Sequence, residues 1–277
     1  MNRAILTDLK RAIRLNLEEK ASQIIESRGA YLSKRDISSL IRYMDKLSTH
    51  PYKVVQYIYG VSAYEWGFKM VGGASLNGYT NIMRFLLKDG LIDPSMRDNF
   101  ALRAASEKGH AEIVRLLLED GRSDPQANNN FAIQYASHYG HTEVVKLLLA
   151  DGRANPSANN NYAIQFASSN GHVEVVQLLL DDERVDPSAF TNITMRRASA
   201  KGHTEIVRLL LEDERIDPSA LSNNAMQSAS ISGYAKVVRI LLGDERVVEA
   251  GLDEAIRYAK KYGNAEIVDL LINTKRN

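Results

Sequence analysis

Apolar residues recur along the chain with helical spacing, in blocks that return every 31 residues. In the stretch from Thr142 to Leu149, the apolar residues at helical spacing are Val144, Val145, Leu147 and Leu148, whereas Glu143 and Lys146 fall on the opposite side. A shorter block that is rich in alanine precedes each such segment. We therefore expect each repeat to contain a short first helix lined with small residues and a second helix with a bulkier apolar face.

Glycine stands between the two blocks of each repeat. It supplies the left-handed conformation that ends a helix in a tight turn. The glycine column comprises Gly78, Gly109, Gly140, Gly171, Gly202 and Gly233, with Gly263 one residue early. A fixed period of roughly 20–50 residues is typical of solenoids, in which each repeat packs only on its neighbours. Such a chain favours an extended binding surface over the closed pocket of an enzyme.

Three further columns accompany the glycines. A proline step predicts a turn at Pro94, Pro125, Pro156, Pro187 and Pro218. Asparagine stands just before the first helix, where we expect its side chain to cap that helix, at Asn99, Asn130, Asn161, Asn192 and Asn223. Alanine, which lets neighbouring helices approach closely, occupies Ala74, Ala105, Ala136, Ala167, Ala198, Ala229 and Ala259.

The repeats resemble the ankyrin repeat. Residues 131–141 read Phe-Ala-Ile-Gln-Tyr-Ala-Ser-His-Tyr-Gly-His, where the family has Thr-Pro-Leu-His-x-Ala-Ala-x-x-Gly-His. The resemblance covers residues 62–277 and implies an all-α fold, an ankyrin-repeat solenoid of stacked antiparallel helix pairs. Because the repeat is shorter than the usual ~33 residues, we expect shortened hairpin loops. This short form is similar to ankyrin proteins of amoeba-infecting giant DNA viruses and amoebal protists.

The repeats divide the chain into three segments. Residues 62–247 carry the 31-residue repeats. Residues 248–277 lack the proline turn and are more charged, so we expect a C-terminal capping repeat there. Residues 1–61 are interpreted either as degenerate ankyrin-like units or as a small helical cap domain.

Composition narrows the possible partners and the compartment. The net charge of +1 gives no overall field that would attract nucleic acid or an anionic membrane. The chain has no cysteine, which removes disulfides and thiolate metal sites and favours a reducing environment. No apolar run has the length of a signal peptide or a transmembrane helix. We expect an intracellular, cytoplasmic protein, in the host cytoplasm if it is viral.

Little in the sequence predicts catalysis or a cofactor. The histidines of the Gly-His column are interpreted as structural, because repeats stacked about 8–10 Å apart cannot share a zinc ion bound at about 2.0–2.1 Å. These are His110, His141, His172 and His203. No phosphate-loop or hydrolase motif occurs. We predict no enzyme activity, no metal, no cofactor and no small-molecule substrate.

Arginine recurs near each turn, two residues after an aspartate. The pairs are Asp120 and Arg122, Asp151 and Arg153, Asp182 and Arg184, Asp213 and Arg215, and Asp244 and Arg246. Such a column of arginines suggests a phosphate-binding strip. Since the acids cancel its field, we favour a ladder of ion pairs instead.

Recognition residues are expected where the first helices vary between repeats. In ankyrin folds these helices help to form the concave binding face, and aromatic residues and Arg are frequent interface anchors. The candidate partner-binding residues are Tyr135, His138, Tyr139, Phe166, Asn170, Arg197 and Lys201. Packing between repeats is the competing interpretation of Tyr135 and Phe166. Phe131 and Tyr162 are interpreted as structural residues against the hairpin base.

We therefore predict a non-enzymatic scaffold that binds another protein on the concave face, and no nucleic acid or membrane. The alternative is a structural component of a larger assembly, such as a virion, that docks through its N-terminal units. A third hypothesis is nucleic-acid binding through residues 1–60, which carry 11 Lys and Arg against 6 Asp and Glu. Aromatic residues between Tyr31 and Trp66 are compatible with base stacking, although we favour irregular packing for them.

Overall fold

Helices account for all the regular structure in the described part of the chain. The computed structural model describes residues 3–14, 39–40, 43, 63–88, 92–247 and 251–276. Within these ranges no strand occurs, so the predicted all-α architecture is confirmed. None of the helices in these ranges is long and apolar enough to cross a membrane.

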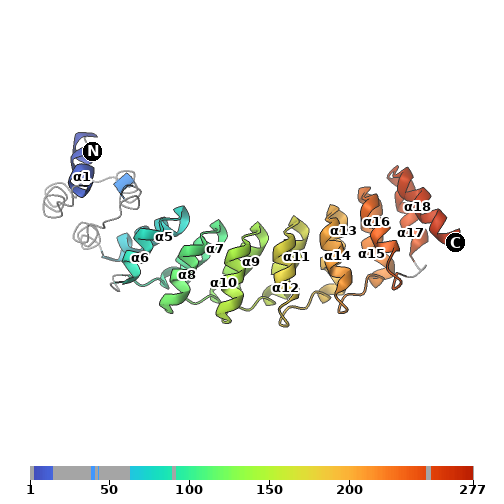
Figure 1. The fold of residues 1–277 in the computed structure, drawn as a ribbon, viewed down its shortest axis with the longest axis horizontal. Helices are drawn as coiled ribbons and strands as arrows, with labels where there is room; N and C mark the ends of the chain where they lie inside the picture. Colours follow the sequence, from blue (N-terminus) through green and yellow to red (C-terminus); the bar gives the residue numbers. More distant parts are fainter. Residues whose placement is uncertain are drawn as a thin grey trace. The chain divides into compact units, whose positions relative to one another are not determined.

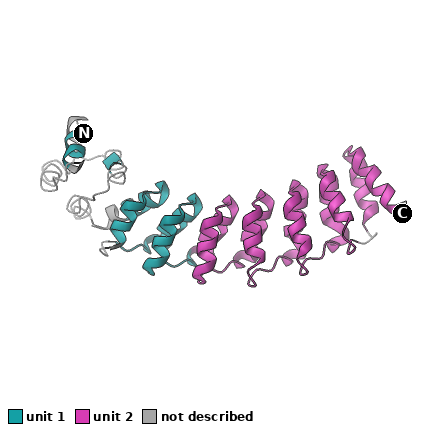
Figure 2. Cartoon of the chain, viewed as in Figure 1, with its two compact units in different colours: residues 1–127 teal, residues 128–277 magenta. Residues whose placement is uncertain are grey.

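The chain forms two compact units, residues 1–127 and 128–277 (Figure 2). The described helices of the first unit are α1 (Arg3–Arg14), α5 (Ala63–Asn77), α6 (Thr80–Lys88), α7 (Met96–Lys108) and α8 (Ala111–Asp120). The second unit begins within α9 (Ala127–Tyr139) and continues with α10 (Thr142–Asp151), α11 (Ala158–Asn170), α12 (Val173–Leu180), α13 (Ala189–Lys201), α14 (Thr204–Glu212), α15 (Ala220–Ser232), α16 (Ala235–Leu242), α17 (Leu252–Lys261) and α18 (Ala265–Arg276).

The predicted division at residues 61 and 247 stays a prediction. Most of residues 1–61, and residues 248–250, lie outside the described residues. Most of the aromatic stretch between Tyr31 and Trp66 also lies outside the described residues. Docking through the N-terminal units and nucleic-acid binding through residues 1–60 therefore stay hypotheses.

Helices of the second unit lie in two layers (Figure 1). The first helices α11, α13, α15 and α17 pack on one another in order, and the second helices α10, α12, α14, α16 and α18 do the same. Each first helix from α11 onward also packs on the second helix that follows it. The first unit repeats the scheme, with α5 against α7 and α6 against α8.

Small side chains separate the first helices and larger ones fill the second layer. Ala167 and Ala198 are fully buried on α11 and α13. Val176 and Leu179 are fully buried on α12, as the sequence period requires. The predicted contrast between a small-residue helix and a bulkier one is therefore confirmed.

Three left-handed residues follow each proline step and form a turn at the start of the first helix, within the bounds given above. The turns are residues 97–99, 128–130, 159–161, 190–192 and 221–223. This conformation costs roughly 1–2 kcal/mol per residue for most side chains, and Asn is among the residues that tolerate it best. Phe190 and the β-branched Thr191 also adopt it, with φ of 53° and 56°. The repeat context therefore imposes the turn, whatever the residue type.

The asparagine column links repeats and does not cap the helix that follows it, which corrects the prediction. Asn161 Oδ1 accepts a hydrogen bond from the backbone N–H of Asp186, 25 residues later, at 2.9 Å. Asn130 accepts one from the N–H of Asn155 at 2.6 Å. Asn99 accepts the equivalent bond from Asp124, and Asn192 instead donates to the carbonyl of Asp217. In these four repeats the side chain thus ties the left-handed turn to the proline turn of the next repeat.

Histidine rings cover the turn glycines of the preceding repeat. A Cβ atom on Gly171, where φ is +83°, would lie 2.9 Å from Cε1 of His203. Nε2 of His203 is 2.9 Å from the carbonyl oxygen of Ser169, and the equivalent bond joins His172 to His138. His110 makes the same contact with Leu76 at 3.3 Å, so the structural interpretation is confirmed for His110, His172 and His203.

In each aspartate–arginine pair the two side chains form an ion pair, and the arginine of several pairs also bonds to the preceding repeat. Arg184 Nη2 lies 2.6 Å from Asp182 Oδ2, and its Nη1 donates to the carbonyl of Ala154 in the preceding repeat at 2.9 Å. Hydrogen bonding from Arg184 holds the pKa of Asp182 below its usual value. Arg215 bonds to Val185 in the same way. The predicted ion pairs are confirmed, and their arginines are engaged in structure.

Candidate interaction surface

Two pairs of stacked rings lie on neighbouring first helices. On α9 the rings of Phe131 and Tyr135 stack with centroids 3.8 Å apart. On α11 the rings of Tyr162 and Phe166 stack at 3.9 Å. Each pair is four residues apart, so both side chains emerge on the same side of their helix. All four residues are half-buried.

The two pairs join into one row, which we call the aromatic strip (Phe131, Tyr135, Tyr162 and Phe166). Tyr135 and Tyr162 meet across the helices with centroids 6.2 Å apart and planes 24° from parallel. The guanidinium carbon of Arg197, on α13, lies 4.6 Å from the centroid of Phe166. Such a cation–π contact contributes about 0.5–1 kcal/mol at an exposed site. The row therefore crosses three first helices and ends in a cation.

His138, Tyr139 and Asn170 border the aromatic strip. The ring of His138 lies 5.3 Å from that of Phe166, and Nδ2 of Asn170 donates to the carbonyl of His138 at 2.9 Å. Burial, reinforced by the charge of His172, lowers the pKa of His138, which keeps the imidazole neutral near pH 7. Tyr139 is 48% exposed, the largest exposure among these rings.

Acidic residues are absent from four successive first helices. α9, α11, α13 and α15 contain no Asp or Glu, whereas α13 carries Arg196, Arg197 and Lys201. Their partners α10, α12 and α14 each contain at least one acid. The face that the first helices present is thus aromatic at α9 and α11 and cationic at α13.

Later repeats do without the aromatic strip. The positions equivalent to Tyr162 and Phe166 hold Ile193 and Arg197 on α13, and Asn224 and Ser228 on α15. The Oγ of Ser228 bonds to the Oδ1 of Asn224 at 3.3 Å. Since α13 and α15 have the same turn and the same packing as α11, the repeat fold does not require rings at these positions.

The structure brings most of the predicted site residues together. A continuous series of contacts connects Tyr135, His138, Tyr139, Phe166, Asn170 and Arg197. Lys201 is exposed one turn after Arg197 and lies on the same helix.

Sequence reasoning separated Phe131 and Tyr162 from this group, although their rings belong to the aromatic strip. The signal that identifies them is the four-residue spacing to Tyr135 and Phe166 within one helix.

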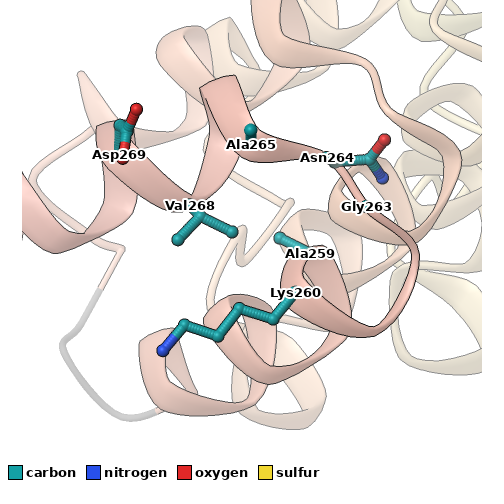
Figure 3. A pocket seen from close by; sticks show the side chains of 7 residues that line it. All are labelled: Ala259, Lys260, Gly263, Asn264, Ala265, Val268 and Asp269. Atoms are coloured by element: carbon teal, nitrogen blue, oxygen red, sulfur yellow. The ribbon is translucent and has the colours of Figure 1, made fainter.

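A shallow pocket of about 260 Å³ lies elsewhere, between α17 and α18 (Figure 3). It is lined by Ala259, Lys260, Gly263, Asn264, Ala265, Val268 and Asp269. A Cβ on Gly263 would have no neighbour within 4 Å, whereas the ring of His203 covers Gly171. In several earlier repeats the histidine of the following repeat covers the turn glycine, and the pocket lies at the corresponding uncovered glycine, Gly263. The pocket contains none of the candidate residues. Within the described ranges no three His, Asp or Glu side chains gather as a metal site.

Comparisons with known proteins identify the repeats. Residues 98–130 match the family model "Ankyrin repeat", and residues 121–191 match "Ankyrin repeats (3 copies)". A search of curated proteins finds no match. Among solved structures, the ankyrin repeat protein EF0377 is 26% identical, with 62% of this chain and 96% of that chain covered and a TM-score of 0.54.

The ankyrin repeat domain of Bcl-3, a member of the IkappaB protein family, is also similar in fold. It is 20% identical, with 73% of this chain and 97% of that chain covered and a TM-score of 0.58. Residues 98–191 thus match ankyrin repeats, and the fold is the predicted ankyrin-repeat solenoid of stacked helix pairs.

Proposed function

We propose that the protein is a non-enzymatic scaffold that binds another protein through the first-helix face of its second unit. This is the face that the sequence predicted as concave. The observation that carries the proposal is the aromatic strip, which crosses α9 and α11 and ends at Arg197. Ankyrin repeats are an interaction fold, and aromatic residues and Arg are enriched among interface anchors.

Two features support binding in preference to packing alone. First, α15 adopts the same turn and packs in the same way with Asn224 and Ser228 at the equivalent positions. Second, Tyr139 remains 48% exposed beside the strip. A large ring that is half in water offers apolar area and a hydroxyl group to a partner.

The source and compartment remain predictions of this proposal. An intracellular location rests on the absence of cysteine. A viral or amoebal origin rests on the 31-residue repeat alone.

The test begins with purification of a tagged full-length protein from its source cell and identification of co-purifying proteins by mass spectrometry. Binding of the purified partner is then measured for the wild type and for Tyr139→Ala, Lys201→Ala and Lys146→Ala. An aromatic anchor is expected to cost ~2 kcal/mol or more of binding free energy, and Lys201 less. Lys146, which is exposed on α10, is the control and should have no effect.

The competing hypothesis predicts the opposite pattern. If recognition lies in the N-terminal units, changes at Tyr59 or Trp66 abolish binding and Tyr139→Ala leaves it unchanged. That result would move the binding site away from the first-helix face.

A further inference from the structure

We propose that the segment recognised by this face is an acidic peptide, whose carboxylates bind Arg197 and Lys201 while its apolar groups lie against the aromatic strip. The inference rests on the proposed function and adds the chemical class of the partner. It follows from charge, from the geometry of Arg197 and from the way in which the rings are stacked.

The arginines of α13 differ from the other described arginines of the second unit. Arg153, Arg184, Arg208, Arg215, Arg239, Arg246 and Arg257 each pair with a carboxylate. Arg196 and Arg197 have no such partner among the described residues, and neither has Lys201. Because the first helices from α9 to α15 contain no acid, the missing negative charge is expected from a partner.

The position of Arg197 suits a carboxylate. Its guanidinium lies over the face of Phe166 at 4.6 Å, which restrains the side chain, and Arg197 remains partly exposed to solvent. The group makes no hydrogen bond within the described residues. A guanidinium held in this way can donate two parallel hydrogen bonds to one carboxylate without a large loss of side-chain entropy.

Ring stacking favours a peptide over a nucleic acid. Tyr135 lies between Phe131 and Tyr162, and Phe166 lies between Tyr162 and Arg197. The faces of Tyr135 and Phe166 are therefore already engaged by neighbours and are not free to stack on bases. The edges of these rings carry partial positive charge and favour carboxylate and carbonyl oxygens.

Phenol groups add hydrogen-bond donors to the same face. Burial raises the pKa of the Tyr162 phenol, and Tyr135 and Tyr139 raise it further, while Arg197 lowers it. The phenol therefore stays protonated near neutral pH and can donate to an acidic partner. No carboxylate contributes to this shift, in keeping with a face that lacks acids.

The experiment uses a phage library of random 12-residue peptides selected on the immobilised full chain. We expect the selected peptides to be enriched in Asp and Glu, together with apolar residues. Synthetic copies are then titrated by fluorescence anisotropy against the wild type and variants. Arg197→Ser, which copies Ser228 of the next repeat, is expected to weaken binding at least about tenfold. Lys146→Ser on α10 serves as the control and should bind as the wild type does.

Two further measurements test the role of charge. Raising the salt concentration from 50 to 300 mM should weaken binding several-fold, because the screening length for exposed charges falls from roughly 14 Å to about 6 Å. Selection on Arg197→Glu should enrich peptides in Lys and Arg where the wild type enriched acids.

The outcomes separate this inference from the proposed function. If the selected peptides depend on Phe166 for binding but are not enriched in Asp and Glu, the inference of an acidic partner is wrong, whereas the proposed binding face still stands. If the selection yields no binders, or only peptides insensitive to both Phe166→Ser and Arg197→Ser, the proposed function fails as well. If a 20-nucleotide oligo-dT binds more tightly than the selected peptides and its binding depends on Arg197, the face binds nucleic acid and the inference of an acidic peptide is wrong.

Discussion

The repeats of α9–α12 and those of α13–α16 share one backbone but present different surfaces. Both have the left-handed turn before the first helix, the fully buried alanine column and the aspartate–arginine pair after the second helix. Four positions on their first helices differ. Phe131, Tyr135, Tyr162 and Phe166 in the former correspond to Ile193, Arg197, Asn224 and Ser228 in the latter.

The difference separates the residues that specify the fold from those that are free to serve recognition. Side chains that tie one repeat to the next, such as Asn161 and Arg184, make the same bonds in most repeats. The rings of the aromatic strip contact each other over two repeats and are then replaced by one aliphatic residue, Ile193, and by polar or charged residues. Packing alone gives no reason for that change, whereas a binding face does.

The largest effect is expected in the alanine column, where both kinds of repeat should respond alike. Ala167→Leu and Ala198→Leu each insert a larger side chain between first helices at fully buried positions. Each should lower the free energy of unfolding by about 1–3 kcal/mol, as measured by urea denaturation. Ala150→Leu, at an exposed position of α10, should change it by less than about 0.5 kcal/mol. Equal losses at all three positions would contradict the packing described here.

A smaller effect is expected at the asparagine column. Asn161→Ala removes the bond to the N–H of Asp186 and leaves that donor unpaired, whereas Asn160→Ala changes a neighbouring left-handed residue without such a side-chain bond. Because this bond is only partly buried, Asn161→Ala should cost about 0.5–1.5 kcal/mol more than Asn160→Ala in thermal or urea unfolding. If the two variants are equally stable, the bond between repeats contributes nothing.

Acid should remove a modest part of the stability through the aspartate–arginine pairs. The pKa of Asp182 is lowered in the folded state by hydrogen bonding from Arg184, and that of Asp213 by Arg215. The stabilisation is thus complete above the unfolded pKa of about 3.8 and is lost as pH falls through the folded pKa. Between pH 6 and pH 2, the free energy of unfolding should fall less steeply for Asp182→Asn and Asp213→Asn than for the wild type. The two variants should show a similar reduction in slope. If a variant shows the same dependence of unfolding free energy on pH as the wild type, its aspartate–arginine pair does not contribute to the acid loss.

The smallest effect on stability is expected at the surface positions proposed for binding. Tyr139→Ala and Lys201→Ala alter exposed side chains, so the free energy of unfolding should stay within about 0.5 kcal/mol of the wild type. Differential scanning calorimetry checks this. A loss near that of Ala167→Leu would indicate that these residues pack in the fold.

Sequence periodicity predicted the helix pairs, the turn glycines and the buried alanines, because each depends on contacts within a repeat or on one repeated spacing. It did not predict the left-handed turns. Asn159, Asn160 and Asn161 are compatible with that conformation, but Phe190 and Thr191 give no such signal. The bond from Asn161 to Asp186 joins residues 25 apart and depends on how repeats stack, which the sequence does not specify.

For the candidate site, the sequence likewise indicated the residues but not how they are arranged across repeats. Variation between repeats identified Tyr135, Phe166 and Arg197, and helical spacing alone would have added Phe131 and Tyr162. That the rings of α9 and α11 form one row depends on the distance between repeats. For the same reason, the competing packing interpretation of Tyr135 and Phe166 had to stay open at the level of the sequence.

One variant tests most directly whether the aromatic strip serves recognition. Phe131→Asn, Tyr135→Ser, Tyr162→Asn and Phe166→Ser together give α9 and α11 the residues that α15 carries at the same positions. Circular dichroism and urea unfolding of this variant are measured beside its affinity for the peptides selected on the wild type. We predict unchanged helicity and cooperative unfolding, with affinity reduced at least about tenfold. A variant that fails to fold would show that the strip is packing, and one that binds as the wild type does would place recognition elsewhere.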